Sequence, residues 1–312
     1  MRRFRWFLVC CLLLTGSRTF ALEFFGDVLY WQATEPVDWA MNTNASPTDQ
    51  FVAFKTLGFD FATGFRVGAG VGLESDWGVK LSYTRFDTDT EDTATGKVTP
   101  NFLGCRLDAN KLSSPYFQNG DAQAAIDYNV LDLDFGKSFC LSESWRLRPV
   151  LGLRGAWINQ TFNSEFQGPW PGTSITSETA DEHINNDFWG IGPKLGIEST
   201  LNLWRGQECK VDLAMNFYTA CLLGFWTIND ATTTTTNQGV STLVVPIDNR
   251  DFGALTFQAM IGLHLNYRNW NATAGYEFND WLNQCQIFDD ATGPHNNDLI
   301  LQGLTVRVGR GY

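Results

Sequence analysis

The sequence lacks any long hydrophobic run outside its first twenty residues. Its most apolar segment, Phe7 to Leu14, is far shorter than the roughly 20 residues that a membrane-spanning helix needs. No later segment offers even 18 consecutive apolar residues. A helical membrane protein is therefore excluded, although 44% of the residues are hydrophobic and 14% are aromatic. With 29 glycines and only 10 prolines, this composition fits a large β protein or a membrane β-barrel.

Positive charge and histidine are also scarce. The chain holds 22 lysines and arginines against 34 acidic residues, and only three histidines. A net charge of −12 argues against a nucleic-acid partner, because phosphate contacts need clustered basic side chains. The cysteine and histidine spacings match no zinc pattern. We expect no metal, no other cofactor and no nucleic-acid partner.

The N-terminus has the form of a secretory signal peptide. Arg2, Arg3 and Arg5 precede the apolar core, and Thr19-Phe20-Ala21 places small residues at the positions that signal peptidase requires. Cleavage after Ala21 leaves residues 22–312 as a single mature domain. Four arginines are lost with the leader, so the mature net charge is about −16.

Five cysteines remain after cleavage, and an exported chain meets an oxidising compartment. The number is odd, so at least one thiol is free or bonded to another chain. We expect some of them to form disulfides between neighbouring chains, with local pairing or reduced thiols as the alternative. The disulfide candidates are Cys105, Cys140, Cys209, Cys221 and Cys285.

The last sixteen residues, Asn297 to Tyr312, alternate in the manner of a half-buried strand. Leu304, Val306 and Val308 share one face, and smaller or polar residues occupy the other. An outer-membrane barrel commonly ends on such a strand with a terminal aromatic, because its last strand must pair with its first. We therefore expect Tyr312 to be the barrel-closing residue and this strand to engage the barrel-assembly machinery.

Similar alternation recurs along the chain and gives about ten strands, with eight or twelve as alternatives. The connections alternate between short and long, and the long ones are expected at residues 35–50, 87–123, 163–186, 226–250 and 281–296. Short periplasmic turns and long outer loops produce this order in membrane barrels. The sequence therefore predicts an all-β, antiparallel, up-and-down transmembrane barrel in the outer membrane of a Gram-negative bacterium, in contact with outer-membrane lipid. Aromatic residues near strand ends are expected to form interface girdles: Trp77, Tyr83, Trp145, Trp189, Trp270 and Phe278.

Several segments also resemble the major outer membrane proteins of the Legionella type, pore-forming barrels of legionellae and chlamydia-related bacteria. The resembling segments are Leu29-Tyr30-Trp31, Gly64-Phe65-Arg66-Val67-Gly68 with Trp77, Tyr83-Thr84-Arg85-Phe86, Gly190-Ile191-Gly192-Pro193-Lys194 and Gly303-Leu304-Thr305-Val306-Arg307. The resemblance spans nearly all of the mature chain apart from the outer loops. It implies an abundant porin-like protein, and a homo-oligomer is a further expectation.

If the apolar faces meet lipid, the polar positions between them line the lumen. Charges of both signs fall there, which predicts a polar passage for small solutes or ions with weak ion preference. The alternative is that the charges pair across the lumen and plug a narrow barrel, with a structural or adhesive role. The predicted lining residues are Arg66, Lys80, Asp132, Asp134, Arg154, Lys194, Glu198, Lys210, Asp212, His264, Glu277 and Arg307.

The rival interpretation is an enzyme at the barrel mouth. Asp87 and Asp89 leave one strand at its outer end, and Asp181 and His183 precede another. Omptin-type surface proteases activate water with two carboxylates and an Asp–His pair, which is feasible acid–base chemistry. Both pairs, however, lie in acid-rich polar stretches where such spacings arise by chance. We therefore expect no enzymatic activity.

Overall fold

The computed structural model describes residues 21–45, 50–102, 104–105, 116–169, 178–247, 252–287 and 298–311. The predicted leader, apart from Ala21, and the predicted closing residue Tyr312 lie outside these ranges. Among the described residues, no helix is long and apolar enough to cross a membrane.

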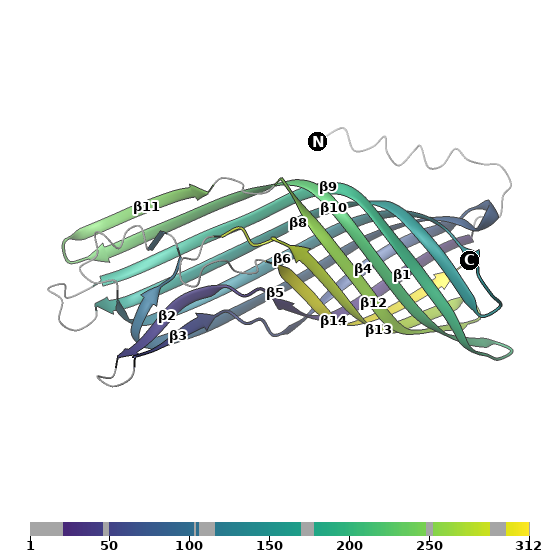
Figure 1. The fold of residues 1–312 in the computed structure, drawn as a ribbon, viewed down its shortest axis with the longest axis horizontal. Helices are drawn as coiled ribbons and strands as arrows, with labels where there is room; N and C mark the ends of the chain where they lie inside the picture. The colour runs from purple at the N-terminus through teal and green to yellow at the C-terminus, as the bar shows by residue number, and fades with distance from the viewer. Residues whose placement is uncertain are drawn as a thin grey trace.

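Ten antiparallel strands form a closed barrel, as predicted (Figure 1). Each strand pairs with the next, and β14 returns to pair with β1. The strands are β1 (Ala21–Thr34), β4 (Phe61–Gly72), β5 (Trp77–Pro100), β6 (Phe117–Lys137), β8 (Trp145–Pro169), β9 (Glu178–Arg205), β10 (Cys209–Thr236), β12 (Gly253–Tyr267), β13 (Trp270–Leu282) and β14 (Leu299–Gly311).

Four shorter strands of the described residues lie outside this ring. β2 (Asp38–Ala45) and β3 (Gln50–Thr56) form a hairpin that meets the outer end of β5, and β11 (Gly239–Ile247) folds back on β10. β7 (Phe139–Cys140) pairs with the start of β8 at the opposite end. The connections at that end are short, as expected of periplasmic turns. One of them contains the 3-10 turn η2 (Glu74–Asp76).

The seam between β1 and β14 depends on a close backbone approach. Gly303 lies directly opposite Trp31, and a Cβ on Gly303 would meet the Tyr30 carbonyl oxygen at 2.2 Å. Its φ of +156° is also one that residues with a side chain rarely adopt. Glycine at this position therefore permits the pairing that removes the open edges of the sheet.

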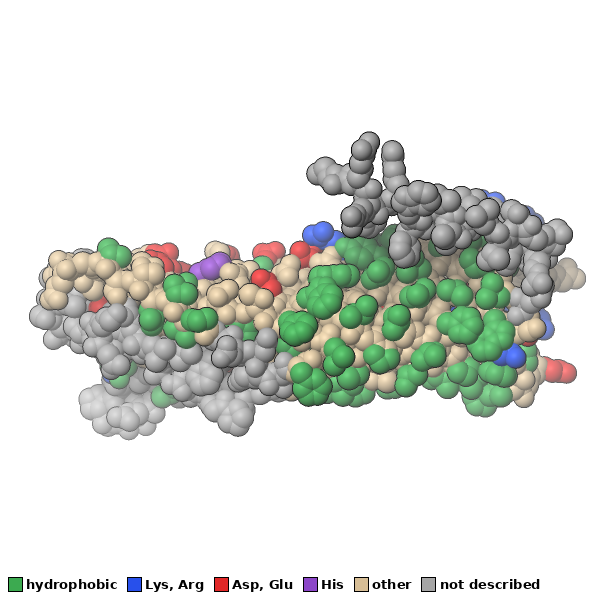
Figure 2. Space-filling view, turned by 90° about the horizontal axis from the view of Figure 1, so that it is seen from above, with side chains coloured by type: hydrophobic (Ala, Val, Ile, Leu, Met, Phe, Trp, Pro, Cys, Tyr) green, Lys and Arg blue, Asp and Glu red, His purple; other side chains and the backbone are tan. Residues whose placement is uncertain are grey.

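The outward positions of the ten strands form an apolar belt. Phe65, Leu133, Leu153, Ile191 and Leu263 are all exposed, which suits contact with lipid tails. Trp77, Trp145 and Trp270 are exposed near the short turns, and Trp157 and Trp189 are exposed at the outer border. Figure 2 shows the belt as hydrophobic side chains over the half of the molecule that holds the barrel, while acidic side chains gather over the other half.

Five adjacent strands continue well beyond this belt, which corrects most of the predicted loops. β5, β6, β8, β9 and β10 have 21 to 28 residues each, whereas crossing a bilayer takes about 9–11. Residues 87–100 and 117–123 are strand, as are 163–169 and 178–186, and the threonines Thr232 to Thr236 lie in β10. Beyond the lipid the outward face meets water, so apolar alternation is lost while β-branched threonine still favours a strand.

Candidate functional site: the barrel lumen

The lumen is divided into three layers along its length. We call the polar cavity at the short-turn end the vestibule, the layer of paired charges in the middle the waist, and the aromatic layer towards the long-strand end the cover. The vestibule opens to the periplasm because the short turns and both described chain ends lie there (Figure 1).

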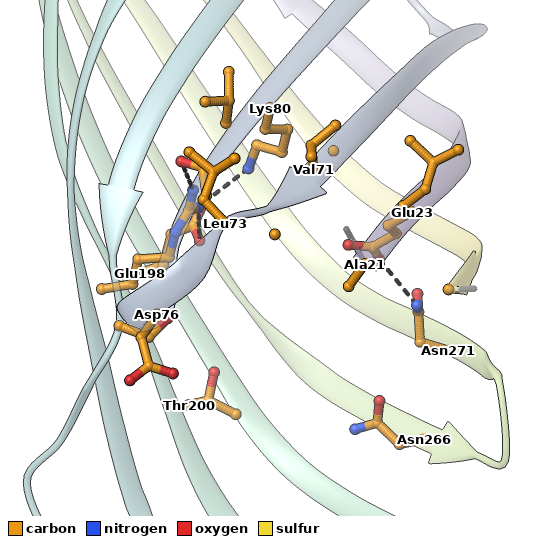
Figure 3. Close-up of a pocket in the computed structure, with 18 of the residues that line it drawn as sticks. Ala21, Glu23, Val71, Leu73, Asp76, Lys80, Glu198, Thr200, Asn266 and Asn271 are labelled. Atoms are coloured by element: carbon orange, nitrogen blue, oxygen red, sulfur yellow. Dashed lines mark hydrogen bonds and ion pairs between the residues drawn. The ribbon is translucent and has the colours of Figure 1, made fainter. Parts of the chain in front are cut away.

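The vestibule has a volume of about 850 Å³. The glycines Gly70, Gly72 and Gly78 contribute to its wall and leave it wide. Charged and polar side chains project into it from several strands, as the close-up in Figure 3 shows for some of them. They include Glu23, Lys80, Arg148, Glu198, Thr200, His264, Asn266 and Asn271.

The first group of waist charges centres on Arg66 of β4. Its Nη1 lies 3.0 Å from Asp27 Oδ2, and its Nη2 lies 2.8 Å from Glu277 Oε1. Arg307 Nε donates to the second Asp27 oxygen at 2.7 Å. Thr305 and Gln258 also donate to Glu277, both at 2.7 Å. Each buried carboxylate is thus paired and hydrogen-bonded, as buried charges must be.

The second group centres on Asp132 of β6. Arg154 binds it through two nitrogens at 2.8 and 2.9 Å, and Lys194 Nζ lies 3.1 Å from it. Lys194 also lies 3.0 Å from Asp134. All four residues are buried, so this group fills its side of the lumen.

The third group shares one acid between two cations at the boundary with the vestibule. Glu198 Oε1 lies 2.7 Å from Lys80 Nζ, and its Oε2 lies 2.7 Å from Arg148 Nη1. The Tyr218 hydroxyl donates to the same carboxylate at 2.5 Å. Figure 3 shows the Lys80 and Glu198 side chains together at the inner end of the vestibule. A pocket of about 40 Å³ lies among the waist side chains.

The cover consists of large aromatic side chains packed across the lumen. Trp281 makes edge contacts with Tyr128 and Phe188, at centroid distances of 5.6 and 6.5 Å, and Phe188 packs on Trp226 at 4.5 Å. Trp31 is fully buried and donates its indole N–H to Thr305 at 3.1 Å. Thr305 in turn donates a hydrogen bond to Glu277, so hydrogen bonds connect the cover to the waist.

Beyond the cover, the segment 284–287 lies across the outer end of the lumen. Trp226 and Asn186 both donate to the Gln284 carbonyl oxygen, at 3.0 and 3.2 Å. Gln160 donates to both carboxyl oxygens of Glu35 at 2.7 Å. Burial raises the pKa of Glu35 to about 7, although these hydrogen bonds oppose the rise.

An acidic pair, Glu182 and Asp230, lies farther out on β9 and β10. Glu182 accepts a hydrogen bond from the backbone N–H of Cys105 at 3.0 Å, and Asp230 accepts one from the backbone N–H of Gly104 at 2.8 Å. Burial, followed by the charge of Asp230, raises the pKa of Glu182 to about 8. Only glycine fits at position 104, because a Cβ there would meet oxygens of both acids and of Thr232 within 2.7 Å.

All twelve side chains predicted to line the lumen lie on the inward face of the wall. Nine of them form the waist. The other three lie nearer the periplasm: Lys210 pairs with Asp212 at 2.8 Å, and His264 contacts Thr273 and Asn266. The charges pair with each other instead of lining an open channel, which is the arrangement that sequence reasoning held as the alternative.

Three members of the waist were missed. Asp27 lies in the first strand, where apolar and aromatic residues occupy both faces and obscure the alternation; its charge in such a strand was the available signal. Arg148 and Tyr218 fall on the same polar faces as Arg154 and Asp212 in the alternation but were not included in the predicted lining. Each holds a charged partner identified above.

The residues of the rival enzyme hypothesis do not converge. Asp87 and Asp89 are exposed on the outward face of β5, and Asp181 and His183 are exposed on the outward face of β9. β6 and β8 lie between these strands, so the two pairs are separated by three strand spacings of about 4.8 Å each. They face away from the lumen and cannot close around one substrate bond.

No disulfide joins any of the five cysteines of the described chain. Cys105 and Cys285 are buried at the outer end, and Cys221 is exposed within the lipid-facing belt. Cys140 is exposed beside a periplasmic turn, and Cys209 is partly exposed at another. Among the described residues, no cluster of three or more histidine, cysteine or acidic side chains has metal-binding geometry.

Comparison with known proteins gives low similarity to solved barrels. The outer membrane protease OmpT from Escherichia coli is 10% identical, with 95% of this chain and 99% of that chain covered and a TM-score of 0.46. A major outer membrane protein from Thermus thermophilus is 9% identical, with 95% and 100% covered and a TM-score of 0.34. The Pseudomonas putida toluene transporter TodX is 8% identical, with 94% and 89% covered and a TM-score of 0.30. No curated protein sequence matches significantly.

The family comparison is decisive. Residues 17–309, nearly the whole chain, match the family described as Legionella pneumophila major outer membrane protein precursor. The match spans the ten-strand barrel from before its first strand to within its last. The chain is therefore an outer-membrane β-barrel of a Gram-negative bacterium and belongs to the Legionella major outer membrane protein family.

Proposed function

We propose that this protein is an outer-membrane porin of low conductance, which lets ions and small polar solutes diffuse passively. The observation that supports it is the vestibule, a wide polar cavity of about 850 Å³ that leads from the periplasm to the charged waist. A barrel with a purely mechanical duty needs no such cavity, because small barrels are filled by their own side chains.

The waist limits what passes. Its side chains line a pocket of about 40 Å³, which is room for a few water molecules at most. A solute crosses when the paired side chains exchange partners and the aromatic side chains of the cover move aside. We therefore expect brief, small conductance steps, well below those of wide trimeric porins with water-filled channels.

The test is planar-bilayer recording of the mature protein, residues 22–312, refolded from detergent. Discrete current steps that scale with salt concentration support the porin. The matched variant is Arg148→Gln, which removes one of two cations from Glu198 at the vestibule end and is expected to change the step size. Barrel insertion is verified separately by protease protection and by heat-dependent gel mobility. The absence of current steps then indicates a closed lumen and not a failed insertion.

The second candidate is a closed structural barrel, and the cover favours it. Trp31, Phe188 and Trp281 are each no more than 1% exposed, so aromatic side chains fill this part of the lumen. An inserted barrel that stays silent in both forms supports this candidate and contradicts the porin.

We further propose that Cys140 links neighbouring chains through a disulfide. It is exposed beside a periplasmic turn and forms no disulfide within the described chain. A disulfide needs Cα atoms within about 7 Å, which neighbouring copies can provide at such a turn. This linkage would stiffen the envelope whether or not the lumen conducts.

A further inference from the structure

Residues 283–287 leave the end of β13 and cross the outer end of the lumen above the aromatic cover, and we call them the strap. The last four residues of the strap are all buried, at no more than 6% exposure. The strap reaches past β12 to the next two strands of the ring. There Trp226 of β10 and Asn186 of β9 both donate to the Gln284 carbonyl oxygen, at 3.0 and 3.2 Å.

Asn186 binds the strap at a second point and connects it to a buried acid. Its side-chain oxygen accepts the backbone N–H of Gln286 at 3.3 Å, and its amide nitrogen donates to Gln160 of β8. Gln160 in turn donates to both carboxyl oxygens of Glu35 at 2.7 Å. The Cys285 thiol hydrogen-bonds the same carboxyl group. Glu35 is therefore joined to the strap directly through Cys285 and indirectly through two amide side chains.

Glu35 differs from the acids of the waist because no cation accompanies it. It follows β1 and is 2% exposed. Among the described residues, its hydrogen-bond partners are an amide from β8 and a thiol from the strap, both uncharged. The neighbouring attachments of the strap, Asn186 and Trp226, are uncharged as well. An ionised Glu35 would therefore be a buried charge with no opposite charge beside it, which is strongly unfavourable.

Two other acids lie at the foot of the strap, where it leaves β13. Asp298 accepts the backbone N–H of Asn283 at 2.8 Å. Asp280 lies on the outward face of β13, and burial, followed by the charge of Asp298, raises its pKa. Neither charge contributes to the pKa shift of Glu35, which arises from burial and is opposed by its two hydrogen bonds.

The closed position of the strap also carries costs of its own. Asn283 has a φ of +53°, which residues other than glycine adopt infrequently. The side-chain amide of Gln284 is fully buried, and neither its oxygen nor its nitrogen has a hydrogen-bond partner among the described residues. Water would satisfy both atoms if the strap moved outward. A charge buried beneath the strap therefore acts on a segment whose closed position is already opposed.

From these contacts we infer that the strap is a gate over the outer end of the lumen, which stays shut while Glu35 is protonated and is released when Glu35 ionises. Release lets water reach the carboxylate and uncovers the aromatic layer below. The inference does not depend on the proposed porin function, because the strap covers the outer end of a conducting barrel and of a closed one alike.

The direction of the pH dependence follows from the two states of the acid. With the strap closed the pKa of Glu35 is about 7, whereas a solvated carboxyl keeps its ordinary value of 4.5. The closed state binds the proton more tightly, so it is most favoured below the ordinary value and loses this advantage as pH rises through the closed-state value. Linkage gives a fall of about 20-fold in the ratio of closed to open strap between about pH 5.5 and 7.5.

The experiment measures how fast a maleimide reacts with Cys285 in the mature chain, refolded in detergent, across this pH range. Cys285 is 2% exposed in the closed strap, so labelling requires release. The labelled chain keeps Cys285 and has its other cysteines replaced by serine. A second chain that keeps only the exposed Cys140 gives the rate of an accessible thiol at each pH. Relative to that rate, we expect labelling of Cys285 to rise about 20-fold from about pH 5.5 to 7.5.

Three further variants identify the cause. Glu35→Gln keeps an acceptor for Gln160 but cannot ionise, so labelling of Cys285 should stay slow at both pH values. Glu182→Gln removes the other buried acid with a raised pKa and, as the matched control, should leave the rise intact. Trp226→Phe keeps the ring but loses its hydrogen bond to the strap. It should speed labelling about fivefold at both pH values and leave the rise between them unchanged.

A relative rate that is independent of pH in the wild-type barrel, or a rise that persists in Glu35→Gln, would overturn the inference. Labelling of Cys285 as fast as that of Cys140 at the lower pH would also contradict it, because the strap would not be closed. A rise that Glu182→Gln abolishes would assign the titration to the outer acidic pair and overturn the role of Glu35. The current recordings test the porin separately: pH-dependent labelling of a silent barrel supports the gate and contradicts the porin.

Discussion

Arg66 on β4 and Glu277 on β13 meet inside the barrel, with 2.8 Å between Nη2 and Oε1. β1 and β14 lie between these two strands in the sheet, so the contact spans the seam at which the barrel closes. The closure of the wall is therefore supported from within by charges as well as by the backbone ladder between β1 and β14.

Removing this cation should destabilise the barrel strongly. Arg66→Gln leaves Asp27 and Glu277 with less compensation in a buried layer, and breaking a buried pair typically costs about 3–5 kcal/mol. Guanidinium unfolding in lipid vesicles would measure the loss. Arg85→Gln, which breaks an exposed pair, should cost less than about 1 kcal/mol. Equal losses for the two variants would show that the waist contributes no special stability.

The acidic pair at the outer end should make stability depend on pH. Folding raises the pKa of Glu182 from 4.5 to about 8, so the folded chain retains a proton that the unfolded chain releases in this window. Stability is then highest below the unfolded pKa and falls as pH rises through the folded value. Burial likewise raises the pKa of Asp230. Hydrogen exchange in β9 and β10 between about pH 5 and 9 would report this loosening.

Glu182→Gln is the matched variant, since it keeps an acceptor for the Cys105 N–H but cannot ionise. Exchange in β9 and β10 should depend less steeply on pH in this window than in the wild type, once the intrinsic pH dependence of exchange is subtracted. A wild-type profile that is flat, or a variant profile as steep as that of the wild type, would contradict the assignment of the titration to this pair.

Thinning the cover should widen the lumen. Trp281→Ala removes a fully buried side chain that contacts Tyr128 and Phe188, at an expected cost of about 3–5 kcal/mol in stability. The conductance step should grow, since the aromatic layer occupies the outer end of the path. Trp270→Ala, which removes an exposed tryptophan of the periplasmic girdle, serves as the control for general loosening.

Gly303→Ala should impair closure of the barrel. The added methyl group would lie 2.2 Å from the Tyr30 carbonyl oxygen at the seam, so β1 and β14 must separate locally. We expect a lower refolding yield and loss of the heat-dependent shift in gel mobility. Gly26→Ala is a matched control on the same pair of strands, because nothing lies within 4 Å of the Cβ that it adds.

The proposed linkage through Cys140 predicts a dimer band on non-reducing gels of isolated outer membranes, because one cysteine per chain can join only two chains. Reductant should convert the dimer to monomer, and Cys140→Ser should abolish the dimer. Cys221→Ser, at an exposed position in the lipid belt, should leave the dimer band intact. A single monomer band without reductant would rule out the linkage.

Much of the fold could be predicted from the sequence, because strands that cross the lipid belt must alternate apolar outward residues with small or polar inward residues. Leu304 and Val308 face outward and Thr305 faces inward, as their spacing indicated. The same spacing placed Lys194 and Glu198 inside the barrel. The ten strands, the short turns and the return of β14 to β1 all follow from that one physical constraint.

The outer half could not be predicted in the same way. Between Thr88 and Thr95 the inward residues are small or polar, and the outward residues meet water, so both faces of the strand look alike. The sequence pattern also does not indicate which charged side chains pair with each other across the lumen. Asp27 and Glu277 lie in the first and the ninth strands of the ring and share one arginine, a relationship that appears only when the wall closes.

The five long strands are neighbours in the sheet, and the five short ones complete the ring. The wall is consequently tall on one flank and low on the other, which gives the molecule a front and a back at the cell surface. An antibody or a phage that approaches along the membrane therefore meets the long strands from one direction and the short strands from the other.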